Sequence, residues 1–453
     1  MFSLRSPMPE GMGWARALIR TWVSLSSVNL GKVVFVLLFS LTALAGQKTS
    51  GLPGAIQTTG QTVTPAATQQ SSSVAGAATP NSRPEAVKAA SETGASGPSP
   101  SSLDTIVVTA VGDVMLGTTF PDESTLPPND GAGLLDEVTP LLRRGDVVYG
   151  NLEGPLTDGG DSAKCRGKKE GTCFAFRVPT RYNTYLKDAG FNAMGLANNH
   201  AMDFGQEGRT SSRTALDAVQ IAHTGEVGDI ARLTVKGRKV EIIAFATYPG
   251  AYNFLDLDES LQTIRAARAE ADLVIVGFHG GAEGATHQHV LAGDETFLGE
   301  DRGDLRKFTH SAIDAGADLV LGSGPHVVRA MEVYKGKLIA YSLGNFATYG
   351  PFNLSAENGL SLVLEAHLAA DGTFLGGRVY PVKQEKPGGP KLDPAARILP
   401  VLRGLSNTDF GPNAVVVGPR GELGLPGTII PPCSNAPDLL EQPLNSSLCG
   451  IFP

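Results

Sequence analysis

From Ile106 onward, short runs rich in β-branched residues alternate with stretches of helical length, and this alternation limits the fold more than any other feature of the chain. It is typical of α/β domains, in which helices cover a sheet of strands. Strands are expected at 106–112, 146–150, 192–196, 240–247, 273–278, 319–322 and 338–342, and helices at 133–144, 181–189, 211–222, 260–269 and 305–315. The alternation of Leu360, Leu362 and Leu364 predicts antiparallel strands, so mixed β-sheets flanked by helices are expected.

The residues before this domain form two different segments. Arg16, Arg20 and Lys32 precede an apolar run at 33–45, which ends in small residues. This pattern predicts that residues 1–46 are a signal peptide, with an N-terminal membrane anchor as the alternative. Residues 47–103 are rich in Ala, Ser, Thr and Pro and have almost no large apolar side chains, so a disordered linker is expected there. An exported protein, periplasmic or at the cell surface, is therefore predicted.

The four cysteines agree with export. Cys165 and Cys173 are close in sequence, as are Cys433 and Cys449, and none has the spacing of a zinc or redox site. Two local disulfides, Cys165–Cys173 and Cys433–Cys449, are expected in an oxidising compartment. The second would staple a Pro- and Gly-rich tail, residues 405–453, which is expected to be irregular.

The charge of the chain argues against one class of partner. The formal net charge is −8 and the isoelectric point is near 5.6, and no basic stripe interrupts this acidic balance. Phosphate backbones would on balance be repelled, so nucleic acid is excluded as a partner.

Polar residues gather where the predicted strands end, each with glycine nearby. They are Asp113 in VGDVMLG, Asn151 and Glu153 in GNLEGP, Asn198, Asn199 and His200 in LANNHAMDFG, His279 and Glu283 in FHGGAE, and His326 in GSGPHVV. The carboxyl ends of strands in an open α/β sheet meet at one crevice, so these segments are expected to form a single site. Glycine beside each would let the backbone approach a ligand or metal.

The segments GDVMLG, GNLEGPLT, LANNHAMDFG, HGGAE, GPHVV and YSLGNF, in this order, resemble the CapA family of capsule and poly-γ-glutamate synthesis proteins. That family is similar to calcineurin-like metallophosphoesterases. The resemblance implies a metallophosphoesterase-like layered fold for a catalytic domain at 104–404, of hydrolase type. It implies that the partner is a capsular or polyanionic polymer or its precursor, or membrane-bound synthesis machinery. It also implies that His200 is the catalytic imidazole and that a metal is bound by Asp113, Asn199, His279 and His326.

Three positions depart from the phosphoesterase pattern. Met115 stands in place of the first-motif histidine, Asn151 replaces a bridging carboxylate, and Gly324 replaces the first histidine of an HPH motif. Each change removes a charge or a lone pair from the metal shell, and two adjacent cations need bridging anionic ligands. At most one divalent metal ion, weakly held, is therefore expected.

The same residues also suit chemistry without a metal. His200 or His326 beside Asp113 or Glu153 would form a pair for general acid–base catalysis, and Asp203 either caps a helix or orients His200. The residues expected to be catalytic are His200, Asp113, Glu153, Asn199 and His326, and those expected to bind substrate are Asn151, Asn198 and Glu283. Two alternatives to a metal-dependent hydrolase remain: a non-catalytic polymer-binding or assembly component, and a metal-independent acid–base enzyme acting on a peptide-like substrate.

Overall fold

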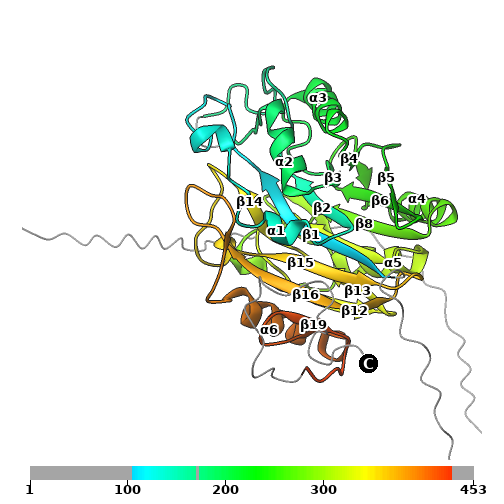
Figure 1. Cartoon of the computed structure of the whole chain (residues 1–453). Coiled ribbons are helices and arrows are strands. Elements are labelled where there is room, and N and C mark those ends of the chain that lie inside the picture. Colours follow the sequence, from blue (N-terminus) through cyan, green and yellow to red (C-terminus); the bar gives the residue numbers. More distant parts are fainter. Residues whose placement is uncertain (1–104, 170–172, 431–453) are drawn as a thin grey trace, which may run out of the picture. The chain divides into compact units, whose positions relative to one another are not determined.

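The computed structural model describes residues 105–169 and 173–430, in which the chain forms two large β-sheets and six α-helices (Figure 1). The predicted signal or anchor segment, the predicted linker and the Cys433–Cys449 pair lie outside the described residues. None of the helices in the described ranges is long and apolar enough to span a bilayer.

The first sheet is mixed. Its strands are β1 (Ile106–Met115), β2 (Val147–Leu152), β3 (Ala193–Gly195), β4 (Ala222–Thr224), β14 (Asn345–Thr348), β15 (Leu360–Leu368), β16 (Phe374–Lys383), β17 (Lys391–Leu392), β18 (Val416–Val417) and β19 (Glu422–Gly424). They lie in the order β18-β19-β16-β15-β1-β2-β3-β4, with β14 beside β1 and β17 beside β16. β1 runs parallel to β2 and β14 but antiparallel to β15.

The second sheet is also mixed. Its strands are β5 (Ala231–Val235), β6 (Arg238–Ala246), β7 (Tyr252–Asn253), β8 (Leu273–His279), β11 (Leu319–Ser323), β12 (Met331–Tyr334) and β13 (Lys337–Ala340). The order is β12-β13-β11-β8-β6-β5, with β7 beside β6, and β6, β8, β11 and β13 are parallel. A separate hairpin consists of β9 (Glu295–Phe297) and β10 (Glu300–Gly303).

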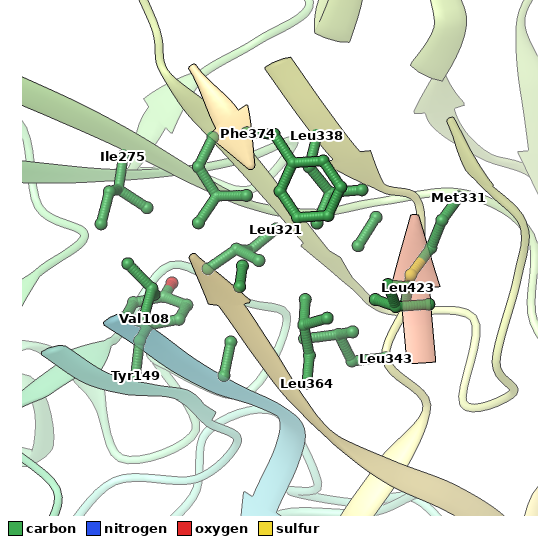
Figure 2. Packing of buried hydrophobic residues seen from close by; sticks show 14 of the residues in the cluster. Val108, Tyr149, Ile275, Leu321, Met331, Leu338, Leu343, Leu364, Phe374 and Leu423 are labelled. Carbon is green, nitrogen blue, oxygen red and sulfur yellow. The ribbon is translucent and has the colours of Figure 1, made fainter. Parts of the chain in front are cut away.

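The main core lies between the two sheets. Val108 of β1, Tyr149 of β2 and Leu364 of β15 share one buried apolar cluster with Ile275 of β8 and Leu321 of β11 (Figure 2). Side chains alternate between the two faces of a strand, so the residues next to these point away from this core. The contact between the sheets is therefore formed by every second residue of the central strands.

Helices bury the outer faces. Val148 of β2 packs in a cluster with Leu186 and Leu216, which belong to α2 (Asn183–Ala189) and α3 (Gly205–Ala218). On the second sheet, Val276 packs with Phe308 of α5 (Leu305–Ala315), in a cluster that also includes α4 (Leu257–Glu270). These layers confirm the predicted α/β fold class of mixed sheets flanked by helices.

Two predictions of secondary structure were wrong. Only α1 (Thr139–Leu142) is α-helical in the segment 133–144, where Gly133 has a φ of 81° and the residues up to Val138 form turns. The tail predicted to be irregular from 405 begins inside α6 (Ile398–Phe410), and β19 then pairs with β16 in the first sheet. Apolar residues of both elements, including Leu402 and Leu423, enter the main core, which explains why this part is ordered.

The topology places the ends of several parallel strands together. Asp113 of β1 is opposite Asn151 of β2 and also opposite Asn345 of β14, while His279 of β8 is opposite Ser323 of β11. β1 approaches the turn before β14 so closely that a Cβ atom on Gly112 would lie 1.8 Å from the Gly344 carbonyl oxygen. Only glycine permits this contact, which brings Asp113 to the edge shared by both sheets.

Candidate functional site

Asp113, Asn151 and His279 form one buried hydrogen-bonded group. The Nδ2 atom of Asn151 donates to Oδ1 of Asp113 at 2.9 Å and lies 3.3 Å from Nδ1 of His279. That Nδ1 atom also lies 3.1 Å from the hydroxyl of Ser323, which itself donates to the Phe278 carbonyl. With the ring proton on Nδ1, the serine oxygen, whose own proton is donated to Phe278, accepts from His279. The lone pair of the imidazole is then on Nε2, the state in which histidine binds a metal.

His326 completes a cluster with two carboxylates. Its Nδ1 atom lies 3.1 Å from Oδ2 of Asp113 and 3.0 Å from Oδ1 of Asn345, and its Nε2 atom lies 3.5 Å from Oε1 of Glu153. The backbone of His326 has a φ of 58°, unusual for a residue other than glycine. One ligand atom from each of Asp113, Glu153 and His326 lies within 4.8 Å of the others.

Several buried polar atoms around this cluster have no hydrogen-bond partner. They are both carboxylate oxygens of Glu153, the Nε2 atom of His279 and the Oδ1 atom of Asn199. An unpaired buried acceptor costs roughly 1–3 kcal/mol, and each of these atoms carries a lone pair. Oxygen and nitrogen atoms with free lone pairs are the ligands that a divalent cation requires.

Burial and neighbouring charge change the protonation of the cluster. Burial lowers the pKa of His326, but the charges of Glu153 and Asp113 outweigh it and raise the pKa to about 10. Burial raises the pKa of Asp113, but the hydrogen bond and charge of His326 outweigh it, so this pKa is lowered. Burial and the charge of Asp113 raise the pKa of Glu153. Burial also lowers the pKa of His279 to about 3, so this ring is neutral.

His200 is held by a second group of contacts. Its Nδ1 atom lies 2.7 Å from Oδ2 of Asp203, whose Oδ1 atom accepts from Lys164 at 2.7 Å. The amide of Phe176 donates to Oδ2 of Asp203, and the Phe176 ring stacks on the imidazole with centroids 4.1 Å apart. Burial lowers the pKa of His200 although Asp203 opposes this. His200 is therefore a neutral imidazole with Nδ1 occupied, and Nε2 is its free base position.

A pocket of about 520 Å³ gives access to these groups. His200, His326 and Asn199 line it. The other lining residues come from three parts of the sequence: Lys164, Lys168, Cys173, Phe174 and Phe176; Tyr248, Glu283, Leu298, Glu300 and Arg302; and Pro351 and Phe352. The wall that carries Lys164 is closed by a disulfide between Cys165 and Cys173, with Cα atoms 5.5 Å apart. This disulfide confirms the pairing predicted from sequence.

The structure brings the predicted site residues together. Both ends of the Asn151 amide are used, since Oδ1 accepts from Asn198 at 3.0 Å. Asn198 also donates to Leu152 and accepts from the amide of His200. Both asparagines are buried, and their amides contact neighbouring side chains and backbone, so their binding of substrate stays a prediction. Glu283 does line the pocket, where its carboxylate accepts from Arg302 at 2.8 Å.

Lys164 and Arg302 line the pocket and contact residues of the site, but neither was predicted from the sequence. Lys164 comes directly before the disulfide-closed loop, and Arg302 from the β9–β10 hairpin, and neither follows a strand that was predicted. The flanking cysteines were the one signal that could have pointed to Lys164. Asp203 had been given two alternative roles, and its contact with His200 favours the orienting one.

The structure also explains two of the departures in sequence. Met115 is fully buried in the apolar cluster under α2 and α3. Gly324 has a φ of 113°, and a Cβ atom there would lie 2.8 Å from backbone atoms of Gly280. A side chain at position 324 is therefore excluded by the local backbone, and the site is built without it.

Comparisons with known proteins find a matching family and relatives of this chain. The family model described as "Bacterial capsule synthesis protein PGA_cap" matches residues 107–349. The PGA biosynthesis protein CapA of Bacillus subtilis (strain 168) is 27% identical over 288 residues, covering 60% of this chain and 70% of that protein. The capsule biosynthesis protein CapA of Bacillus anthracis is 28% identical over 297 residues, covering 60% of this chain and 66% of that protein.

Solved structures with a similar chain path are more distant. The NAD nucleotidase of Haemophilus influenzae is 11% identical, with a TM-score of 0.33, and the match covers 66% of this chain and 56% of that chain. The match therefore spans little more than half of the nucleotidase and about two thirds of the Bacillus anthracis protein.

Proposed function

Because this chain belongs to the PGA_cap family of bacterial capsule synthesis proteins, we propose that it is an exported hydrolase that acts on a capsular, poly-γ-glutamate-like polymer or its precursor. The basic n-region and short apolar run before Gly46 support export, and the disulfide Cys165–Cys173 is consistent with an oxidising compartment. The partner is the polymer or the membrane-bound machinery that makes it.

One observation carries the catalytic part of this proposal. Lone pairs of Glu153, His279 and Asn199 have no hydrogen-bond partner, and Asn199 lines the same pocket as His200, the partner of Asp203. A purely structural site would satisfy its buried acceptors, because each unpaired one is destabilising. The cluster is instead suited to a cation, and the pair beside it to proton transfer.

The described residues fit one divalent metal ion. Asp113, Glu153 and His326 would hold it, with His279 and Asn199 offering further lone pairs. A bound divalent ion polarises a substrate oxygen and lowers the pKa of water. In the metal-free protein the positive charge beside the two carboxylates is the proton of His326, whose pKa is raised to about 10. Two carboxylates and a neutral amide at position 151 give no basis for a second tightly held cation.

His200 would move the proton. Asp203 accepts from Nδ1, which leaves Nε2 to take a proton from the attacking water. As the new bond to oxygen forms and the scissile bond breaks, the same proton passes to the leaving group. Asp203, Lys164 and Phe176 fix the ring in this orientation and tautomer.

Turnover of poly-γ-glutamate and of a phosphate ester by the purified protein, paired with metal analysis, tests the proposal. We expect one exchangeable metal, and loss of hydrolysis on chelation and in both His200→Ala and His279→Ala. His289→Ala is the matched control, because His289 is half exposed and contacts Asp409 outside the pocket.

The other outcomes identify the alternatives. Hydrolysis that survives chelation and His279→Ala but not His200→Ala would indicate a metal-independent acid–base enzyme. Polymer binding without hydrolysis, unchanged in His200→Ala, would indicate a binding or assembly component.

A further inference from the structure

We propose that Arg302 forms a subsite that binds a carboxylate of the substrate through its Nη1 group. This inference rests on the proposed function in one respect, since it names the group of an anionic polymer that the pocket recognises. Its evidence is separate and comes from a part of the pocket wall that is distant in sequence from the disulfide-closed loop.

The Arg302 guanidinium is fixed from two directions. Its Nη2 atom donates to Oε1 of Glu283 at 2.8 Å, and its Nε atom donates to Oε2 of Glu300 at 3.1 Å. The guanidinium carbon lies 5.7 Å from the ring centroid of Tyr248 and 5.5 Å from that of Phe297. A cation held in this way loses little further conformational freedom when it binds a ligand.

The backbone also ties Arg302 to the catalytic segments. Its carbonyl accepts from the amide of Gly281, two residues beyond His279. The amide of Gly284, next to Glu283, donates to the carbonyl of Pro325, next to His326. The subsite therefore stands on the same loops as the cluster of Asp113, Glu153 and His326.

The remaining donor of Arg302 has no hydrogen-bond partner among the residues that the structure describes. The side chain is only 4% exposed, it lines the pocket, and its Nη1 atom is buried without a hydrogen bond. Arg329, Arg213 and Arg378 each leave an Nε atom unpaired, but none of the three lines this pocket. Arg302 thus combines an unpaired charged donor with a position in the wall of the pocket.

The local charge selects the kind of ligand. Glu283 and Glu300 carry two negative charges against the single positive charge of Arg302, so no net positive charge draws anions to the subsite. Glu300 is 54% exposed and screened by water, whereas the guanidinium is buried. Recognition then depends on the direction of the Nη1 hydrogen bonds, and a planar carboxylate presents oxygens in the geometry that a guanidinium prefers.

Glutarate, a small dicarboxylate, is the probe that tests the subsite, with binding measured by calorimetry on the full-length protein. We expect Arg302→Gln to weaken glutarate binding by roughly 10- to 100-fold, because the variant loses one charge-assisted hydrogen bond to the carboxylate. Arg378→Gln is the matched control, because Arg378 is also buried beside a glutamate but lies on β16 outside the pocket. Its affinity for glutarate should equal that of the unaltered protein.

Hydrolysis of poly-γ-glutamate, measured in parallel, separates this inference from the proposed function. Arg302-dependent glutarate binding without hydrolysis of any polymer would support the subsite and overturn the proposed function. Hydrolysis together with glutarate binding that Arg302→Gln leaves unchanged would overturn the subsite alone. Absence of glutarate binding to the unaltered protein would likewise overturn it. Where polymer is hydrolysed, Arg302→Gln should raise KM for the polymer and leave KM unchanged for an oligomer whose carboxylates are amidated.

Discussion

The Nδ1 atom of His200 lies 2.7 Å from Oδ2 of Asp203 in the wall of the pocket. The aspartate is fully buried, and it also accepts from Lys164 and from the amide of Phe176. Its carboxylate thus joins the imidazole to residues on either side of the disulfide-closed loop. The arrangement resembles the orienting carboxylate of other acid–base pairs, where it fixes the tautomer without taking the proton.

Asp203→Asn should therefore abolish most of the proposed hydrolysis. An amide can present its NH₂ group to Nδ1, which favours the wrong tautomer, and acid–base catalysis typically contributes on the order of 10²- to 10⁴-fold. Turnover rates of the variant and the unaltered protein measure this directly. Asp229→Asn is the control, since Asp229 makes a similar contact of 2.8 Å with Nδ1 of His223 away from the pocket. Equal losses in the two variants would show that the effect is one of stability.

Removal of the disulfide is expected to lower both the stability and the activity of the protein. Its two cysteines are separated by 8 residues, and closing a loop of this size stabilises the folded chain by about 2–3 kcal/mol. Cys165→Ser with Cys173→Ser should lower the free energy of unfolding by this amount, as measured by urea titration. Activity should fall further than stability explains, because Lys164 is adjacent to Cys165. Full activity at a temperature where the variant is folded would show that Lys164 does not need the disulfide.

Sequence reasoning located the site because its residues follow buried strands. Asp113, Asn151 and His279 each lie at the end of a β-branched run, and parallel strands carry their ends to one edge. The same reasoning could not assign contacts within the site. The amides of Asn151 and Asn198 form hydrogen bonds within the site, whereas the Oδ1 atom of Asn199 has no partner. This difference depends on residues that lie tens of positions away in the sequence.

Other parts of the molecule were beyond local patterns. Arg302 enters the pocket from a short hairpin with no clear alternation of polar and apolar residues. In the segment 133–144 the helical pattern was overridden by Gly131 and Gly133, which both adopt a positive φ. The order of the segment 405–430 comes from tertiary packing against the first sheet.

Metal content should depend on the carboxylates of the cluster. Glu153→Gln keeps the shape of the side chain but removes the charge of a group whose oxygens both lack a hydrogen-bond partner. We expect its affinity for a divalent ion to fall by at least about 10- to 100-fold, the range typical for loss of a group that only supports a metal ligand. Metal analysis after dialysis measures this, with Asp229→Asn as a control that should retain the metal. Two stoichiometric metals that survive dialysis in the unaltered protein would contradict the single-ion site.

The protonation of His326 predicts how the metal-free protein responds to alkali. Burial lowers the pKa of His326, but Glu153 and Asp113 raise it to about 10, whereas an unfolded histidine titrates near pH 6.5. Because the folded protein binds this proton more tightly, the protonated His326 contributes its full stabilisation below about pH 6.5. This contribution is lost as the pH rises through about 10. Urea titrations with chelator across this window should show a falling free energy of unfolding. His326→Gln should reduce the slope, and an identical slope would contradict the assignment.

Gly324 gives a test of why the site lacks a further histidine. A Cβ atom at this position would lie 2.8 Å from Gly280 backbone atoms, and its φ of 113° is unfavourable for other residues. Gly284 in the neighbouring loop has a φ of 93° but no atom within 4 Å of a Cβ, so Gly284→Ala isolates the backbone strain. Gly324→Ala should destabilise the protein by about 1–3 kcal/mol more than Gly284→Ala, the usual effect of overpacking. Gly324→His should bind no additional metal, because its imidazole cannot be placed without moving the loop that follows His279. A stable Gly324→His variant with a second bound metal would show that this backbone adapts and that the missing ligand alone limits the site.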